Sequence, residues 1–255
     1  MASGSTVGAS DWGSPAHEFS VPSGPAAAEP DGVGQVRRAS AIPPQVEQEV
    51  WNACMIDLFG DVFDTGGPGR VVAVLGDSSG VQLRLPALAD RRNRWLMAAH
   101  CGENFGSAVH SGRVRRVVES RPHAAVLLFG TNSASTFWTP RPDLLDAAAE
   151  SFRSLIDATD SVPCRVLFTV PVRPPGRSVD EDAEGWTTVQ RTINRWITSI
   201  DAAHHPGVLV IDWDAITRAE PSLLLDDAHM TQAGITRRFT LIHDAVNRCP
   251  TPPPV

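Results

Sequence analysis

The stretch VVAVLGDSSG at residues 71–80 decides the fold and points to the chemistry. Its apolar half lacks polar alternation, which is typical of a parallel strand buried on both faces. Its polar half places Ser78 at the C-terminal tip of that strand, where a helix is expected to begin. A hydroxyl there lies near unpaired backbone N–H groups and the positive end of a helix dipole. Asp and Ser are also ordinary capping residues, so Gly-Asp-Ser has meaning only together with later segments.

Apolar runs and amphipathic stretches alternate through the rest of the chain. Four further strands are expected, at 95–99, 124–129, 165–170 and 208–212, and helices are expected at 80–90, 107–120, 141–158, 185–203 and 231–247. Strands followed by helices predict a parallel sheet that is covered on both faces. The fold class is therefore α/β, a three-layer α/β/α sandwich on a five-stranded parallel sheet. Ligands of such sheets bind beyond the carboxyl ends of the strands.

The composition divides the chain into three parts. Residues 1–43 are rich in Gly, Ser, Ala and Pro, and they contain too few large apolar groups to offset the entropy of ordering. We predict a disordered tail there, a single domain at 44–249 that begins with an amphipathic helix, and a frayed Pro-rich end at 250–255. The 255 residues are enough for one sizeable core.

The net charge and the residue types present limit the partners and the reactions that the chain could support. The formal net charge is −7 and there is no long basic run, so no nucleic-acid partner is expected. All 22 basic residues are arginine, and tyrosine is absent. Schiff-base chemistry, a P-loop lysine and a Ser-Lys dyad are therefore excluded, and histidine and the carboxylates are left to move protons.

The four cysteines are scattered along the chain, at Cys54, Cys101, Cys164 and Cys249. No pair has the spacing of zinc ligands or of a redox motif, so we predict free thiols or small apolar core residues. No stretch resembles a signal peptide or a transmembrane segment. These observations favour a cytoplasmic protein, with a fragment or relative of a membrane-attached enzyme as the alternative.

One segment after the last predicted strand contains the groups that would activate a serine. Serine is a weak nucleophile and needs a base, and His229 is the candidate. Asp226, three residues earlier in DDAHM, has the spacing to orient that imidazole and to stabilise its charged form. The alternative is a simple helix entry, with a surface histidine and with Thr231 as the N-cap.

Candidate donors for an oxyanion follow two other strands. Asn132 lies in GTNS after the third predicted strand, and Gly102 and Gly106 lie in GENFGS after the second. The Ser78 backbone N–H, the Gly106 N–H and the Asn132 amide would together bind the oxyanion of an acyl-transfer intermediate. Plain turns are the alternative for each of these segments.

These segments, in this order, resemble the SGNH (GDSL-type) hydrolase superfamily over roughly residues 71–246. The resemblance implies a flavodoxin-like sandwich that needs no metal and no organic cofactor. It implies Ser78 as nucleophile and first oxyanion donor, Gly106 as second donor with Gly102 as the other candidate, Asn132 as third donor, His229 as base and Asp226 as its partner. Ser133 departs from the family pattern, because an aspartate usually follows this asparagine. The C-terminal third is similar to SGNH domains attached to membrane O-acyltransferases.

Other segments bear on the substrate. Phe137 and Trp138 are candidates to line an acyl or sugar pocket, or else to fill the core under a loop. Arg173 lies in a long loop at 171–185 and is a candidate contact for an anionic substrate, with a solvated charge as the alternative.

Together these residues predict a serine esterase acting on short acyl esters, acetyl above all, of a carbohydrate or another small metabolite. Two alternatives stay open: an O-acyltransferase to a sugar hydroxyl, and a catalytically silent binding domain. The sequence does not predict the oligomeric state.

Overall fold

The computed structural model describes residues 62–136, 139–172, 183–200, 205 and 207–250. All of them belong to one compact unit, Ala41–Val255. The predicted tail at 1–43, the predicted first helix and residues 251–255 lie outside the described residues. The boundaries at residues 43 and 250 therefore stay predictions.

A six-stranded sheet with the order β1-β3-β2-β4-β7-β8 forms the centre of this unit. Five strands are parallel to one another: β2 (Arg70–Gly76), β3 (Asn93–Ala99), β4 (Ala124–Leu128), β7 (Arg165–Phe168) and β8 (Val208–Ile211). The sixth, β1 (Phe63–Asp64), is antiparallel to β3. The sheet is thus mixed rather than purely parallel, and the five predicted strands are its parallel part.

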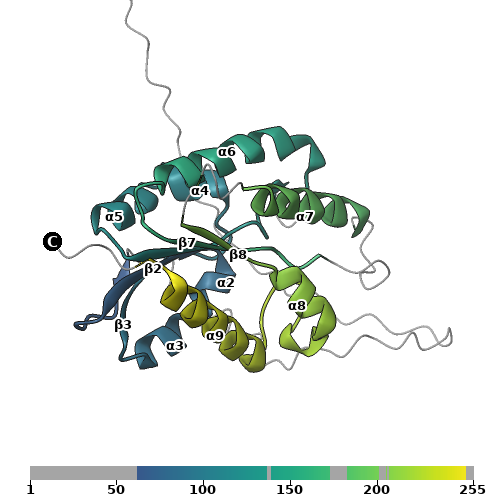
Figure 1. Ribbon diagram of the computed structural model, residues 1–255. Helices are drawn as coiled ribbons and strands as arrows, with labels where there is room; N and C mark the ends of the chain where they lie inside the picture. The colour runs from purple at the N-terminus through teal and green to yellow at the C-terminus, as the bar shows by residue number, and fades with distance from the viewer. Residues whose placement is uncertain (1–61, 137–138, 173–182, 201–204, 206, 251–255) are drawn as a thin grey trace, which may run out of the picture. The chain divides into compact units, whose positions relative to one another are not determined.

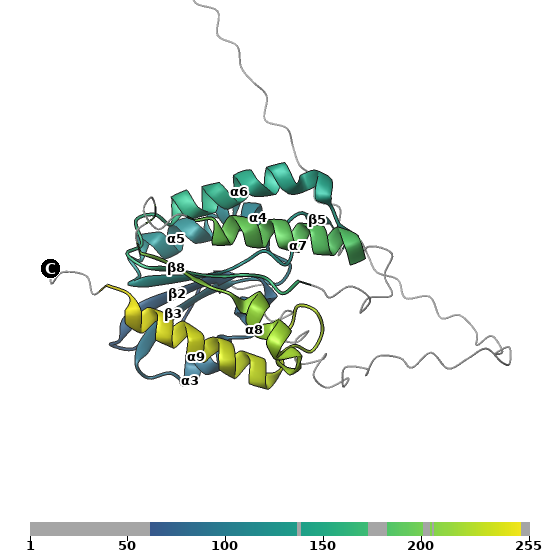
Figure 2. The same ribbon diagram turned by 45° about the vertical axis from the view of Figure 1, so that its right-hand side comes forward.

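Helices cover both faces of the sheet, which confirms the α/β/α sandwich (Figures 1 and 2). One face carries α4 (Phe105–His110), α5 (Arg113–Glu119), α6 (Leu145–Ala158) and α7 (Ala183–Thr198). The other carries α3 (Arg84–Ala89), α8 (Trp213–Ala219) and α9 (Gln232–Arg248). Short elements complete the fold: α2 (Ser78–Val81), β5 (Ser135–Thr136), β6 (Thr139–Pro140), η2 (Pro142–Leu144) and η3 (Pro221–Leu223). In the described part of the chain, every helix is too short or too polar to cross a membrane.

The position of β2 between two helical layers explains why Val71–Leu75 is an unbroken apolar run. Ala73 and Leu75 belong to the core cluster under α4–α7, whereas Val72 and Val74 belong to the cluster under α3 and α9. Successive side chains of a strand point to opposite faces, so a strand between two helical layers needs an apolar residue at each step.

Two expected helices are divided in the structure. The stretch 80–90 holds the end of α2 and all of α3. The stretch 107–120 is interrupted at Gly112, whose φ of +72° is left-handed and ends α4 before α5 begins. The helix α8 was not predicted; Asp212 caps it by accepting the Ala215 N–H at 3.0 Å.

The prediction of free cysteines is wrong. Cys164, which directly precedes β7, is disulfide-bonded to Cys249, which follows α9. Cys101 is disulfide-bonded as well. Cysteine spacing in sequence did not reveal the bond because its partners lie 85 residues apart and meet only in the fold. Cysteine usage therefore gives no support to a reducing compartment, where structural disulfides are rare.

We expect the Cys164→Ala/Cys249→Ala double variant to be less stable than the wild type. A cross-link that closes 85 residues restricts the unfolded chain, which corresponds to about 4–5 kcal/mol in the chain-entropy account. The measurement is the free energy of unfolding from urea titration of both proteins. A double variant as stable as the wild type would show that the bond contributes nothing.

Candidate active site

Ser78 is placed by a tight turn between β2 and α2. Gly76 ends the strand so close to β4 that a Cβ there would lie 2.7 Å from the Leu128 carbonyl oxygen. Asp77 then caps α2: its Oδ1 accepts the Ser79 N–H at 2.9 Å and the Ser79 hydroxyl at 2.8 Å. The Gly-Asp-Ser sequence is therefore explained by close packing and capping, which fix Ser78 at the carboxyl end of the sheet.

Asp226 shapes the loop that carries His229. Its Oδ1 accepts the backbone N–H groups of Ala228 at 2.7 Å and of His229 at 2.6 Å. This leaves Oδ2 to accept from Nδ1 of His229 at 2.7 Å. One carboxylate thus holds both the backbone turn and the imidazole ring.

The structure brings Ser78, His229 and Asp226 together. Nε2 of His229 lies 3.1 Å from Oγ of Ser78, although the two residues are 151 positions apart. A carboxylate can only accept hydrogen bonds, so the bond to Asp226 assigns the ring proton to Nδ1. Nε2 then presents a lone pair to the Ser78 hydroxyl. The arrangement can remove a proton from Ser78.

The electrostatics of the pair support this assignment. Burial lowers the pKa of His229, but the hydrogen bond and charge of Asp226 outweigh burial and leave that pKa above its ordinary value. Burial raises the pKa of Asp226, but the bond to His229 and the two backbone N–H groups hold it below its ordinary value. Asp226 is therefore ionised at neutral pH and stabilises a protonated imidazole.

Gln82 ties the histidine loop to the serine turn. Its side-chain amide donates to the Met230 carbonyl oxygen at 3.2 Å and accepts the Met230 N–H at 3.1 Å. Gln82 directly follows α2, and Met230 directly follows His229. Nothing in the sequence pattern marked this residue as part of the site.

Asn132 and Ser133 follow β4 in a turn that depends on Gly130. Gly130 has φ of +130°, and a Cβ there would lie 2.7 Å from Val170 Cγ1. The Asn132 amide donates to the Glu103 carbonyl oxygen at 3.3 Å, which orients the group and leaves its second N–H for another acceptor. Ser133 is buried, and its hydroxyl accepts the Phe105 N–H at the start of α4. The residue that departs from the family pattern thus connects two segments of the site.

The two candidate glycines differ in their surroundings. Gly106 lies in the first turn of α4, and a Cβ there would face Ser151 Oγ of α6 at 3.2 Å. Gly102 has φ of +75°, with open space where a Cβ would be. Glycine is required by conformation at Gly102 and favoured by packing at Gly106. The oxyanion role of either stays a prediction. Phe137, Trp138 and Arg173 lie outside the described residues.

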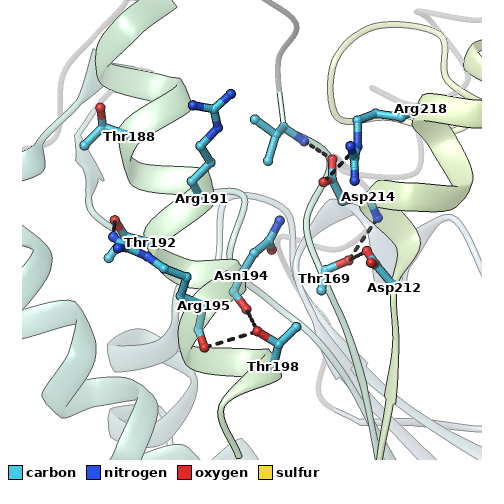
Figure 3. A pocket seen from close by; sticks show the side chains of 11 residues that line it. Thr169, Thr188, Arg191, Thr192, Asn194, Arg195, Thr198, Asp212, Asp214 and Arg218 are labelled. Atoms are coloured by element: carbon cyan, nitrogen blue, oxygen red, sulfur yellow. Dashed lines mark hydrogen bonds and ion pairs between the residues drawn. The ribbon is translucent and has the colours of Figure 1, made fainter.

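A polar cavity of about 710 Å³ lies beyond β7 and β8 (Figure 3). Side chains of α7 form one wall and those of α8 the other, with Thr169 and Asp212 at the strand ends. Asp214 ties the α8 wall to the segment after β7: it accepts the Val172 N–H at 2.8 Å, and it pairs with Arg218 of the same helix at 3.1 Å. Sequence reasoning missed this cavity because its residues come from three separate segments of the chain. Over the described residues, no three histidine, cysteine or carboxylate groups gather as metal ligands.

Comparisons with known proteins agree with the fold. The model of the GDSL-like lipase/acylhydrolase family matches residues 63–237. A lipase/acylhydrolase from Enterococcus faecalis is similar in structure, with 18% identity, 73% of this chain and 100% of that chain covered, and a TM-score of 0.53. Axe2, an acetylxylan esterase from Geobacillus stearothermophilus, is 16% identical in sequence and has a TM-score of 0.49. The match covers 71% of this chain and 95% of that chain. No curated protein matches the chain in sequence.

Proposed function

Because the chain belongs to the GDSL-like lipase/acylhydrolase family, we propose that it is a serine esterase for short acyl esters of a carbohydrate or small metabolite. Acetyl is the acyl group we expect. The observation that carries the proposal is the line of hydrogen bonds from Ser78 through His229 to Asp226. A hydroxyl, a base and an orienting carboxylate at these distances are the parts that covalent acyl transfer needs.

The reaction proceeds in two halves. Oγ of Ser78 attacks the ester carbonyl carbon while Nε2 of His229 takes the hydroxyl proton. The tetrahedral intermediate collapses, the imidazolium gives its proton to the departing alkoxide, and an acyl-serine is left. Water, deprotonated by the same nitrogen, then attacks the acyl carbon and releases the carboxylic acid. Asp226 keeps its charge throughout and stabilises the imidazolium.

Three donors are proposed for the oxyanion: the Ser78 backbone N–H, the second amide N–H of Asn132, and the N–H of Gly106 or Gly102. Ser78 is the first residue of α2, so its N–H has no acceptor within the helix. Loss of one such donor typically costs about 3–4 kcal/mol of transition-state stabilisation. Asn132 supports this role best, because the Glu103 carbonyl already orients its amide.

The polar cavity supports a hydroxyl-rich alcohol as the leaving group. Thr169 and Asp212 follow β7 and β8, so the cavity lies at the same carboxyl edge of the sheet as Ser78. Threonine hydroxyls and guanidinium groups suit the hydrogen bonds of a sugar better than a long acyl chain.

The function is tested with p-nitrophenyl esters of increasing acyl length and with acetylated xylose. We expect p-nitrophenol release from the acetyl ester to exceed that from the octanoyl ester, and acetate release from the acetylated sugar. If added xylose accelerates p-nitrophenol release and acetylated xylose accumulates, the protein is a transferase. If the folded protein cleaves none of these esters, the proposal is contradicted and a binding domain is favoured.

The pH dependence of kcat/KM follows from His229. Only the neutral imidazole accepts the Ser78 proton, so activity falls as pH drops through the pKa of His229. Asp226 holds this pKa above its ordinary value, so we expect half-maximal activity at a pH above about 6.5. The measurement is kcat/KM for p-nitrophenyl acetate between pH 5 and 9, with free p-nitrophenol quantified at a fixed final pH. A half-maximal point well below the ordinary histidine value would contradict the assignment of His229 as base.

A further inference from the structure

Arg238 is an arginine inside the protein, on α9 behind the serine turn. It is 3% exposed, and its guanidinium carbon lies 4.4 Å from the Trp213 ring centroid and 5.2 Å from that of Phe168. Within the described part of the chain, its Nε and Nη1 atoms are buried and have no hydrogen-bond partner. Burial lowers the pKa of Arg238 to about 9, so the group is still charged at neutral pH. Burial of a charged guanidinium without a hydrogen-bond acceptor costs free energy of folding. We therefore expect an acceptor near Arg238.

Asp77 has the complementary feature. It is 1% exposed and directly precedes Ser78. Its Oδ1 accepts both donors of Ser79, whereas its Oδ2 is buried and has no partner among the described residues. Burial raises the pKa of this carboxyl, while the positive charge of Arg238 opposes that rise. The two charges thus act on one another without a direct hydrogen bond.

A single small cavity joins the two groups. Asp77, Ser79 and Arg238 line it together with the ends of β4 and β7, and Ala228 of the histidine loop lies at its edge. About 10 Å³ of this space is open to the centre of a water molecule. That is room for one water molecule, which needs two to four polar partners to be retained.

We propose that one buried water molecule in this cavity links Arg238 to Oδ2 of Asp77, and that this buried ion pair makes Arg238 a positioning residue for the Ser78 turn. The guanidinium donates to the water oxygen, and the water donates to the carboxylate. The bridge holds the Asp77 side chain in place, so that its Oδ1 keeps the two bonds to Ser79 and fixes the first turn of α2. Arg238 touches no reacting atom in this proposal, which rests on the proposed function only for its effect on turnover.

The activity test compares Arg238→Met, Arg238→Lys and, as matched control, Arg237→Met, which removes an exposed charge from the same helix. Misplacement of Ser78 should lower kcat for p-nitrophenyl acetate about 10- to 100-fold in Arg238→Met, with KM within about twofold of the wild type. Arg238→Lys keeps the charge and is expected to recover most of kcat, and the control is expected to match the wild type. A folded Arg238→Met with wild-type kcat overturns the proposal.

A second test needs no substrate and covers a variant that folds poorly. Urea midpoints of Asp77→Asn, Arg238→Met and the double variant form a double-mutant cycle. Removal of one partner leaves the other charge buried and unpaired, so the double variant should be destabilised less than the sum of the single variants. Additive effects overturn the proposal. If the wild type cleaves no ester, the proposed function fails, and this cycle still decides the role of Arg238.

Discussion

Replacing Ser78 with alanine is expected to lower kcat by about 10⁴- to 10⁶-fold, because the acyl-enzyme cannot form and only uncatalysed attack by water remains. The alanine keeps the Asp77 bond to the Ser79 N–H and the Gln82 bonds to Met230, so the fold and the histidine loop should be unchanged. The measurement is turnover of p-nitrophenyl acetate together with labelling by a fluorophosphonate probe. Mass spectrometry of the labelled wild type should place the adduct on Ser78.

The matched control is Ser120→Ala, which removes an exposed hydroxyl at the end of α5. It should label and turn over like the wild type. A Ser78→Ala protein that still forms a covalent adduct, or still turns over at the wild-type rate, would remove Ser78 from the mechanism.

Asp226→Asn should lower kcat by about 10⁴-fold while leaving the loop intact. The asparagine oxygen can still accept the N–H groups of Ala228 and His229, which now bond to Oδ1. The amide NH₂ then faces Nδ1 of His229 and donates to it, which moves the ring proton to Nε2. That nitrogen would present a proton to Ser78 instead of a lone pair, and the base would be lost.

Two results would confirm this reason. The thermal unfolding midpoint of Asp226→Asn should stay near that of the wild type, and Asp244→Asn, an exposed carboxylate on α9, should keep full activity. If Asp226→Asn retained most of its kcat, then Asp226 would have no role in setting the ring proton.

The buried strands could be predicted because burial on both faces requires a run of apolar residues. The run Val71–Leu75 in β2 and all of β4 are apolar because helices cover both faces of these strands. The antiparallel β1 was not predicted because two residues are too few to form a pattern. Helix α8 was missed for a similar reason, since seven residues make only two turns.

Some residues of the site could likewise be predicted from the sequence, and others could not. Ser78 could be chosen because it follows a recognisable strand, and Asp226 and His229 because they shortly precede the last helix. Arg238 could not, because it stands beside Arg237 and the pair reads as an exposed face of an amphipathic helix. The disulfide between Cys164 and Cys249 was equally hidden, since only the folded chain brings residues so far apart together.

The two hydrogen bonds of Gln82 determine which substitutions near His229 the site would tolerate. Both go to the main chain of Met230, so they hold for any side chain at position 230 that fits the core. One side chain therefore ties the histidine loop to the serine turn, whichever residue stands at position 230. Loss of Gln82 would remove both bonds between the two segments, and we expect the contact between Nε2 of His229 and Oγ of Ser78 to loosen in a protein that is otherwise well folded.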